Sequence, residues 1–393
     1  MKIAIVGAGI SGLTAALALY EKGLKDVQIY ERAARLTEVG AGIQLAPNAV
    51  RLLYQLGLAS QLERVAQCTA FGELRRASDN RLLAMLPYAD YFQRHYGLPA
   101  CQLLRADLHD LLLTAVRERQ IDVHLGKELL ESRQSGQEVR MFFSDGSEQV
   151  ADLLIGADGV GSALTTRIFP EHPPRYSGFA CWRALIDQKN TDLEPVNQVT
   201  VWAGPDRHLV AYPAGPSMQL NLVATIRQEH WQYSGRVAPS DKAAWIKAFE
   251  GSCENVSALV DRAPASDLWG LFEQKSLPCW HRGRQVLIGD AAHAMLPNLA
   301  QGAAQGMEDG VVLAQLLAAA GHPSGIEMAL SSFYKQRNSR VKKVQDGARW
   351  NLGFFHQQKS PLTAFRDNLM RLGGPLTTKL IGRKYHWLYC RSR

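Results

Sequence analysis

The 393-residue sequence predicts an α/β fold with an inserted mixed β-sheet domain and C-terminal helices. Three observations predict it. An apolar strand, a glycine-rich turn and an apolar helix open the chain, segments with a β pattern follow one another over residues 171–228, and a further apolar strand at 285–288 leads into a helix. We therefore expect the chain to leave a parallel-sheet domain and later return to it.

The first unit is a strand, a helix and a second strand within about thirty residues. Ile3–Val6 is an apolar run, the helical pattern extends from Ser11 to about Lys22, and Val27–Tyr30 is a second short apolar run. Its glycines argue against reading this apolar N-terminus as a signal peptide or a membrane span.

The turn between the first strand and the helix has the spacing G-x-G-x-x-G. Gly7 permits the tight turn, Gly9 lets a pyrophosphate approach the backbone, and Gly12 lets the helix pack closely on the strand. The helix beginning at Ser11 offers free N–H groups to phosphates. Glu31, nineteen residues beyond Gly12, can accept hydrogen bonds from a ribose hydroxyl. Together these features predict a Rossmann-like, dinucleotide-binding domain.

The middle of the chain continues this domain. Residues 48–57 and 105–118 have a helical period, and two strands, Glu138–Phe143 and Gln149–Ile155, flank a turn. The motif Gly-Ala-Asp-Gly follows directly at 156–159.

The β-patterned segments then mark a second domain. They cover residues 179–186, 197–204, 208–215 and 218–226. The predicted division of the chain is 1–170 for the first part of the nucleotide domain, 171–280 for a β-sheet substrate domain, 281–345 for the return segment and 346–393 for a basic helical C-terminal region.

Composition excludes several classes of protein. The six cysteines are scattered, with no C-x-x-C and no histidine cluster, so a zinc ribbon and a secreted disulfide framework are excluded and no metal site is expected. Reduced thiols indicate a cytoplasmic protein. Beyond the N-terminus no apolar run approaches the ~20 residues of a membrane span.

The net charge of +7 is unevenly distributed. Residues 331–393 hold fourteen Lys or Arg and two Asp, whereas the first 330 residues are acidic overall. Solvated helix faces explain this, because no basic run is contiguous. We expect no nucleic-acid binding, and contact with an anionic membrane surface remains an alternative.

Three separated motifs now stand together: Gly-Ala-Gly-Ile-Ser-Gly with Glu31, the 156–159 motif, and GDAAHAMLPNLAQGAAQGMED at 289–309. In this order, over nearly the whole chain, they resemble the group A flavin-dependent aromatic hydroxylases, especially the salicylate hydroxylase and 6-hydroxynicotinate monooxygenase branch. The resemblance implies a Rossmann-like FAD-binding domain with FAD as cofactor and NAD(P)H and O2 as co-substrates.

The resemblance also assigns residues to the cofactor. Arg105 would contact FAD from a helix start, Asp290 would hydrogen-bond the ribityl chain, and the amides of Gly302 and Ala303 would face the flavin pyrimidine edge. The full set implied is Gly7, Gly9, Ser11, Gly12, Glu31, Arg32, Gln44, Arg105, Asp158, Asp290, Pro297, Gly302 and Ala303.

Two positions depart from the family pattern. After the 156–159 motif the family has Ser, two residues and Arg, whereas here Ser162 is followed by Ala, Leu and Thr, with Arg167 two places later. Handling of NAD(P)H by that arginine is therefore in doubt unless Arg167 compensates. Ala300 replaces a glycine of the family's Pro-x-x-Gly-x-Gly, as the 6-hydroxynicotinate branch also does.

Substrate-side candidates come from the predicted β domain. Tyr212 resembles the acid/base tyrosine of the 6-hydroxynicotinate branch and His208 a pocket histidine, while Arg183 could meet a substrate carboxylate. Asn221 stands where that branch has a tyrosine, and Gln44 where it has an active-site histidine. The alternatives are an ordinary strand aromatic for Tyr212, a core histidine for His208 and an interdomain ion pair for Arg183.

The resemblance implies hydroxylation of a small phenolic or heteroaromatic carboxylate, salicylate-like, through a flavin C4a-hydroperoxide. Decarboxylative hydroxylation is its sharpest form. Two alternatives stay open: a flavin hydroxylase of a membrane quinone precursor, and a FAD-binding reductase or redox sensor that does not oxygenate. We expect a monomer or homodimer, and His293 is expected to be structural.

Overall fold

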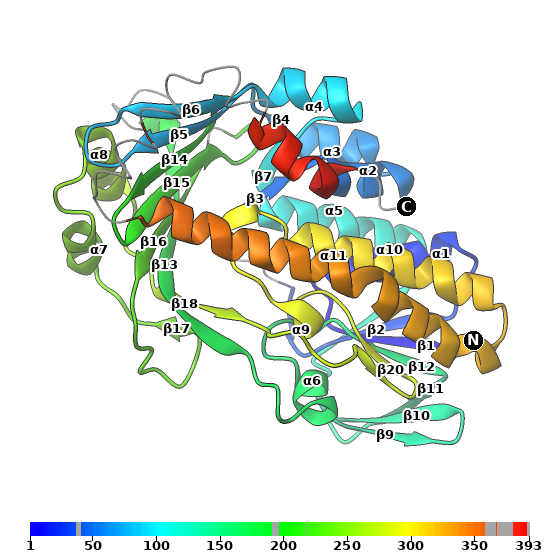
Figure 1. Cartoon of the computed structure of the whole chain (residues 1–393). Helices are drawn as coiled ribbons and strands as arrows, with labels where there is room; N and C mark the ends of the chain where they lie inside the picture. The colour runs from blue at the N-terminus through cyan, green and yellow to red at the C-terminus, as the bar shows by residue number, and fades with distance from the viewer. Residues whose placement is uncertain (37–40, 191–195, 218, 358–366, 368–379, 391–393) are drawn as a thin grey trace.

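The computed structural model describes residues 1–36, 41–190, 196–217, 219–357, 367 and 380–390. Figure 1 shows two bodies, a parallel sheet under helices and a large mixed sheet, with the long helix α11 (Ile326–Phe355) running along both. This arrangement confirms the predicted α/β class with an inserted mixed sheet.

The parallel sheet contains the first predicted unit. Its strand order is β19 (His281–Arg282), β20 (Gln285–Leu287), β12 (Leu153–Gly156), β1 (Ile3–Val6), β2 (Val27–Glu31) and β8 (Asp122–Leu125). Strands β1, β2, β8, β12 and β20 run parallel, while β19 is antiparallel. The chain therefore does return to this sheet near residue 285, as the sequence predicts.

Helices cover this sheet, and the central helix is apolar nearly all round, with nine of its residues buried. Helix α1 (Ile10–Glu21) packs between α5 (Arg105–Glu118) and α10 (Gly302–Ala320). The approach of α1 to α10 is close, since a Cβ added at Gly310 would lie 2.8 Å from the Cα of Ala15. The remaining helices of this body are α2 (Pro47–Gln55), α3 (Ala59–Val65), α4 (Tyr88–Tyr96), α6 (Ala163–Ile168) and α9 (Asp290–His293), with the 3-10 turns η2 (Pro297–Leu299) and η3 (Pro323–Gly325).

The mixed sheet has eight strands and its own core. The order is β17 (Val237–Ala238), β18 (Leu268–Glu273), β13 (Arg175–Asp187), β16 (Gln219–Arg227), β15 (Arg207–Pro213), β14 (Val199–Gly204), β5 (Gly72–Arg76) and β6 (Leu82–Leu86). Helices α7 (Lys242–Ala248) and α8 (Glu254–Arg262) cover its outer face, and η1 (Gln188–Asn190) follows β13. A second apolar cluster containing Trp182 and Trp245 fills the space between.

Two details differ from the sequence-based expectation. Strands β5 and β6, within residues 1–170, pair with the mixed sheet through the parallel β5–β14 ladder, so the N-terminal part of the chain contributes to both bodies. The single strand expected at Gln149–Ile155 is two strands, because Asp152 interrupts it and accepts a hydrogen bond from the Lys2 amide. Met218, the first residue of one predicted strand, lies outside the described residues.

Two small sheets complete the fold. One contains β9 (Leu129–Ser135), β10 (Glu138–Phe143) and β11 (Glu148–Ala151). The other contains β3 (Gly42–Leu45), β7 (Cys101–Leu104) and β4 (Gln67–Cys68). This second sheet lies between the two bodies, since β3 contacts β16 and β7 contacts β15.

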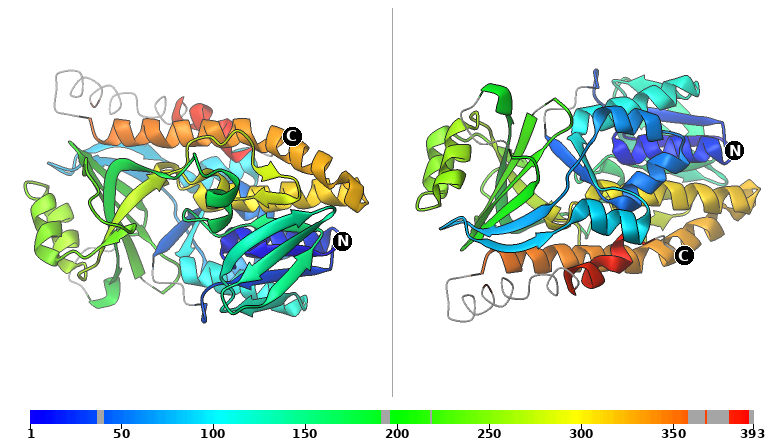
Figure 2. Two further views of the ribbon diagram at one scale, coloured as in Figure 1. Left: turned by 90° about the horizontal axis from the view of Figure 1, so that it is seen from below. Right: turned by 90° about the horizontal axis from the view of Figure 1, so that it is seen from above.

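The basic C-terminal region is partly described. Residues 380–389 form a helix beside α4 and α11 (Figure 2), whereas 358–366, 368–379 and 391–393 lie outside the described residues. Arg340 donates hydrogen bonds to the carbonyls of Trp387 and Leu388, and the Lys343 ammonium makes a cation–π contact with the Trp387 ring. These basic side chains of α11 therefore hold the helix at 380–389 against it. Among the helices that can be described, none is both long and apolar enough to cross a membrane.

Candidate active site

A cavity of about 420 Å³ opens at the carboxyl ends of β1, β2 and β12. Open α/β sheets bind their ligands at this edge. Ten of the thirteen residues predicted for the cofactor line the cavity: Gly7, Gly9, Ser11, Glu31, Arg32, Arg105, Asp158, Asp290, Gly302 and Ala303. The structure therefore brings together residues that are nearly 300 positions apart in the chain.

The three glycines of the first turn have different surroundings. Gly7 has φ +105°, and a Cβ there would lie 2.4 Å from the carbonyl oxygen of Ala157. A Cβ at Gly12 would lie 2.0 Å from the Gly7 oxygen, whereas a Cβ at Gly9 would meet nothing within 4 Å. Gly7 and Gly12 are thus required by packing, and Gly9 leaves open space beside the helix N-terminus.

Glu31 is held at the end of β2 by backbone amides. Its Oε2 accepts a hydrogen bond of 2.9 Å from Ala8, and its Oε1 accepts one of 3.0 Å from Ala33. The buried Nε2 of His109 lies 2.7 Å from the Ala8 oxygen, so α5 supports the same turn. The carboxylate is therefore already oriented toward the cavity.

Asp158 also lines the cavity, and its carboxylate contacts the start of α6. Its Oδ2 accepts a hydrogen bond of 2.8 Å from the Ala163 amide at the start of α6, and its buried Oδ1 has no hydrogen-bond partner in the ranges that the structure covers. Burial raises the pKa of this carboxyl, although hydrogen bonds from Ser162 and nearby amides oppose the rise. Ser162 itself caps α6 by accepting from the Thr165 amide. Arg167 is exposed and does not line the cavity.

Ser11 joins the first turn to the return segment. A Cβ at Gly289 or Gly306 would lie 2.4 or 2.1 Å from its hydroxyl oxygen, so both glycines make room for Ser11. Gly289 precedes Asp290, which is exposed in the cavity, and α10 begins at Gly302 on the same rim. A nineteen-residue helix directs its N-terminal partial positive charge at this point.

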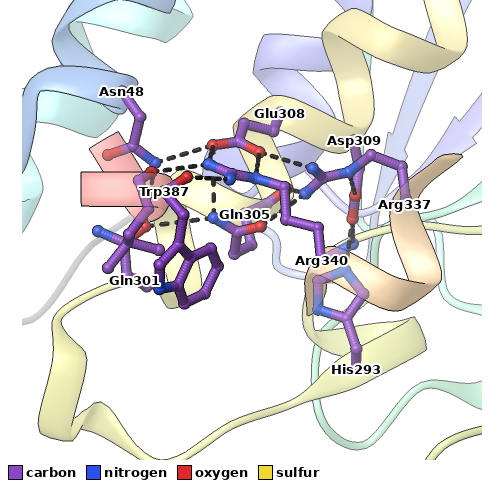
Figure 3. A network of polar contacts seen from close by, with 11 residues as sticks. Asn48, His293, Gln301, Gln305, Glu308, Asp309, Arg337, Arg340 and Trp387 are labelled. Atoms are coloured by element: carbon purple, nitrogen blue, oxygen red, sulfur yellow. Dashed lines mark hydrogen bonds and ion pairs between the residues drawn. The ribbon is translucent and has the colours of Figure 1, made fainter. Parts of the chain in front are cut away.

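A buried polar network lies beneath this rim (Figure 3). The Oδ2 of Asp309 accepts from the Gly289 amide at 2.9 Å and lies 2.5 Å from the Nε2 of His293, while its Oδ1 accepts from Nε of Arg337 at 2.7 Å. Glu308 accepts from Arg337, and further contacts of its carboxylate reach Arg340 and Asn48. The predicted structural role of His293 stays a prediction that this contact supports.

Charge pairing decides the protonation of this network. Burial alone would raise the pKa of Asp309, but His293 and Arg337 outweigh it and lower the pKa. The pKa of Glu308 is lowered in the same way by Arg337 and Arg340. Sequence reasoning assigned no role to Glu308, Asp309 or Arg337. The available signal was the pair of adjacent acids in a helix that is otherwise nearly all apolar.

The mixed sheet presents Tyr212 at the junction with the small β3–β7–β4 sheet. Tyr212 on β15 lies opposite Asn221 on β16, and both are buried. Gly42 on β3 packs against them, because a Cβ there would lie 2.8 Å from Cε2 of Tyr212 and 2.7 Å from Cβ of Asn221. Burial raises the pKa of Tyr212 well above its usual value, against opposing effects of Arg183 and Asn221.

Arg183 on β13 interacts electrostatically with both Tyr212 and Asp290, and Asp290 lines the cavity. The Arg183 guanidinium stacks on Trp269 at 5.7 Å, and among the described residues its buried Nε has no hydrogen-bond partner. Cys181 first, then Tyr212 and Asp290, raise the pKa of Arg183 against the effect of burial. In the described part of the chain no carboxylate forms an ion pair with Arg183, contrary to the alternative that it serves as an interdomain ion pair.

Besides Tyr212 and Arg183, four predicted residues do not line the cavity. His208 lies four residues from Tyr212, about 13 Å along the strand, and its Nδ1 lies 2.5 Å from Nε2 of His356 on the C-terminal side of α11. Pro297 is exposed on η2, and Gln44 shares a strand face with Gly42 toward the mixed sheet; neither lines the cavity. Gly12 does not line the cavity either, and its contact is with the Gly7 backbone.

Conversely, the cavity includes residues that the sequence did not indicate. Lys127, Glu128 and Leu129, at the connection from β8 to β9, line it beside Glu31 and Arg32. No motif distinguishes them in the sequence. Across the described ranges, no three His, Cys, Asp or Glu side chains gather as metal ligands.

Comparison with known proteins agrees with this geometry. The family described as "FAD binding domain" matches residues 1–348. The chain is 35% identical to a 3-amino-4-hydroxybenzoate 2-monooxygenase of Streptomyces platensis, over 99% of this chain and 95% of the relative. It is 34% identical to a 6-hydroxynicotinate 3-monooxygenase of Pseudomonas fluorescens, over 88% and 89% of the two chains. A solved salicylate hydroxylase–substrate complex superimposes with a TM-score of 0.82 at 25% identity, covering 99% and 95% of the chains.

These matches cover nearly the whole chain and include both sheets. They agree with the cavity at the carboxyl ends of the parallel strands, and they favour a monooxygenase over the alternative of a FAD-binding reductase or redox sensor that does not oxygenate. The chain therefore belongs to the FAD-binding aromatic hydroxylases, as an FAD-dependent monooxygenase.

Proposed function

We propose that this enzyme hydroxylates a small aromatic or heteroaromatic carboxylate that carries a ring hydroxyl. The observation that carries the proposal is Arg183, whose buried Nε has no hydrogen-bond partner within the part of the chain that the structure describes, although Tyr212 and Asp290 lie close to its charge. An unpaired buried donor on a cation is costly to stability. A planar carboxylate is the group that a guanidinium binds best. We therefore assign the substrate carboxylate to Arg183.

The names of the relatives support this class of substrate. Substrates named for them are 3-amino-4-hydroxybenzoate, 6-hydroxynicotinate and, for the solved structure, that of a salicylate hydroxylase. Each of these three compounds carries a ring carboxylate and a ring hydroxyl. The proposal takes that shared chemistry and leaves the pattern of substitution on the ring to experiment.

Tyr212 would act on the ring hydroxyl. Because burial raises its pKa, Tyr212 stays protonated near neutral pH and donates a hydrogen bond. A donor beside the substrate oxygen stabilises the phenolate form, which is the form of the ring most readily attacked by an electrophilic oxygen. Asn221 holds Tyr212 in place, and its Oδ1 accepts the Gly42 amide at 2.6 Å.

The residues around the cavity fit FAD. The open backbone at Gly9 and the start of α1 suit the diphosphate, while Glu31 and Arg32 suit the adenosine end. Asp290 suits the ribityl hydroxyls, and the amides at Gly302 suit the flavin ring. Bound FAD, reduced by the NAD(P)H typical of this family, supplies the activation of O2.

A matched substrate panel tests the proposal. We expect purified holoenzyme to oxidise NAD(P)H and add one oxygen atom to a hydroxylated aromatic acid such as salicylate. Product masses then separate simple from decarboxylative hydroxylation, since only the latter also loses CO2. The corresponding methyl esters and carboxylate-free phenols are the controls. Equal turnover of these controls would remove the carboxylate, and with it the assigned role of Arg183.

A further inference from the structure

Two cysteines that are distant in the sequence face each other at the edge of the small sheet. Cys68 on β4 and Cys101 on β7 are directly opposite in an antiparallel pair. Their Sγ atoms lie 3.2 Å apart, and 33 positions separate them in the chain. Cys68 is exposed, whereas Cys101 is buried. Neither thiol has a place in the proposed hydroxylation.

The backbone geometry suits a disulfide between them. Opposite residues of an antiparallel pair have Cα atoms about 4.5–5.5 Å apart. Disulfides occur at Cα separations of about 4.4–6.8 Å. The sulfurs must approach from 3.2 Å to a bond length of about 2.05 Å. Rotation of two side chains is enough for this, so the sheet need not open.

The two thiols have unequal reactivity. The hydrogen bond from Cys101 lowers the pKa of Cys68 to about 7, against opposing effects of burial and of the nearby Glu63. The same contact and burial raise the pKa of Cys101. An exposed thiolate beside a buried second thiol is the arrangement of a peroxide-reactive pair with a resolving cysteine.

We propose that Cys68 and Cys101 form an oxidation site that closes reversibly to a disulfide with hydrogen peroxide. The Cys68 sulfur attacks one peroxide oxygen: an S–O bond forms, the O–O bond breaks, and one water leaves after protonation. The Cys101 sulfur then loses its proton and attacks the Cys68 sulfur: the S–S bond forms, the S–O bond breaks, and a second water leaves. The two sulfurs together lose two electrons, which the peroxide gains. A dithiol then reduces the disulfide to the two thiols by exchange and is itself oxidised to a disulfide.

The site lies on a strand that leads to the cavity. Strand β7 ends at Leu104, and the next residue, Arg105, lines the cavity. The Arg105 amide also donates to the Ala41 oxygen at 2.8 Å, next to β3. A bond at Cys101 therefore joins β4 covalently to the strand that holds Arg105.

Peptide mass spectrometry on the holoenzyme tests the site. We expect stoichiometric hydrogen peroxide, followed by alkylation, to yield a peptide pair joined through Cys68 and Cys101. Dithiothreitol should release the pair. Cys68→Ser should abolish it, and Cys253→Ser, which changes a partly exposed cysteine elsewhere, should leave it unchanged.

Conversion of Cys68 to sulfinic acid while Cys101 stays a free thiol would overturn the proposal. So would a result in which Cys253 or Cys390 reacts while Cys68 and Cys101 stay unmodified. A cross-link of Cys101 to another cysteine in Cys68→Ser would also overturn it. Because Cys101 is buried, its replacement risks the fold. A Cys101→Ala variant that retains FAD adds a second arm, in which Cys68 should pass on to sulfinic acid.

Discussion

The backbone amide of Gly42 donates a hydrogen bond of 2.6 Å to the Oδ1 of Asn221. This bond ties β3, which adjoins the nucleotide cavity through β7 and Arg105, to β16 of the mixed sheet. The same glycine packs on the Tyr212 ring. One contact thus couples the position of the candidate active-site tyrosine to the nucleotide-binding part of the chain.

Gly42→Ala should impair hydroxylation more than FAD binding. The added Cβ would lie within 3 Å of Tyr212 and Asn221, so the tyrosine or β3 must move. A misplacement near 1 Å can cost about 10²-fold in rate, and we expect kcat to fall by that order while flavin absorbance is retained. Gly353→Ala is the matched control, because its Cβ meets nothing within 4 Å. Equal kcat in both variants would contradict the coupling.

Tyr212→Phe and Arg183→Gln should separate two roles. Removing the phenol should leave flavin binding and NAD(P)H-driven reduction intact and lower hydroxylation by about 10²–10⁴-fold, the usual contribution of a positioned proton donor. Replacing Arg183 should mainly raise KM, by about 10–100-fold, since a hydrogen bond to a charged group contributes about 1.5–3 kcal/mol. Stopped-flow flavin reduction and product yield test the Tyr212→Phe prediction, and the dependence of the rate on substrate concentration gives the KM of Arg183→Gln. Unchanged product yield in Tyr212→Phe would remove this residue from the mechanism.

Alanine substitutions at two glycines of the first turn should abolish activity for different reasons, one by preventing folding and the other by preventing FAD binding. At Gly7 the added Cβ meets the Ala157 oxygen at 2.4 Å in a φ that favours glycine, so we expect insoluble or strongly destabilised protein. At Gly9 the Cβ enters open space, and the variant should fold yet lose FAD. Circular dichroism and flavin content distinguish the two. A Gly9→Ala protein with full FAD content would show that no phosphate approaches this backbone.

Asp309→Asn should destabilise the fold. The substitution removes one of the two buried carboxylates that pair with Arg337 and alters the hydrogen-bond partner of His293, and breaking a buried ion pair costs about 3–5 kcal/mol. Asp90→Asn is the control, since the Asp90–Arg94 pair is 70% and 76% exposed and should contribute less than about 0.5 kcal/mol. Urea unfolding measures both. The loss should also lower FAD content, because Asp309 holds the Gly289 amide.

Local patterns predicted the elements whose stability is local. The first strand and helix lie within a residue or so of their expected bounds, and the strand near residue 285 is followed by a helix, α10, as expected. The return strand at Gln285 was equally visible, because a buried parallel strand is apolar throughout. The spacing of the glycines and Glu31 predicted the first turn of the cavity, whereas the resemblance to a known family supplied the rest, including Arg105, Asp290 and Gly302.

Features that depend on pairing across the chain were not visible. Strand β5 joins the mixed sheet through β14, more than a hundred residues later, and nothing in its own pattern names that partner. The same holds for the Cys68–Cys101 contact and for Asn48 with Glu308, 260 positions apart. Strand alternation puts His208 on the same face as Tyr212, as expected of a site residue. Its contact is instead with His356, at the end of α11.

The His208–His356 pair should make stability fall on mild acidification. Burial lowers the pKa of His208 well below 6.5 and that of His356 to about 4, so both are neutral in the folded protein. The unfolded chain binds protons as pH drops below about 6.5 and the folded chain does not, so the free energy of unfolding decreases. The limiting slope is about 1.4 kcal/mol for each pH unit and each histidine. Urea titrations between pH 7.5 and 5 measure the slope above the range where carboxylates titrate. His356→Gln should reduce it, and His230→Gln, at an exposed position, should not. Equal slopes in wild type and His356→Gln would mean that the buried pair takes up protons without unfolding.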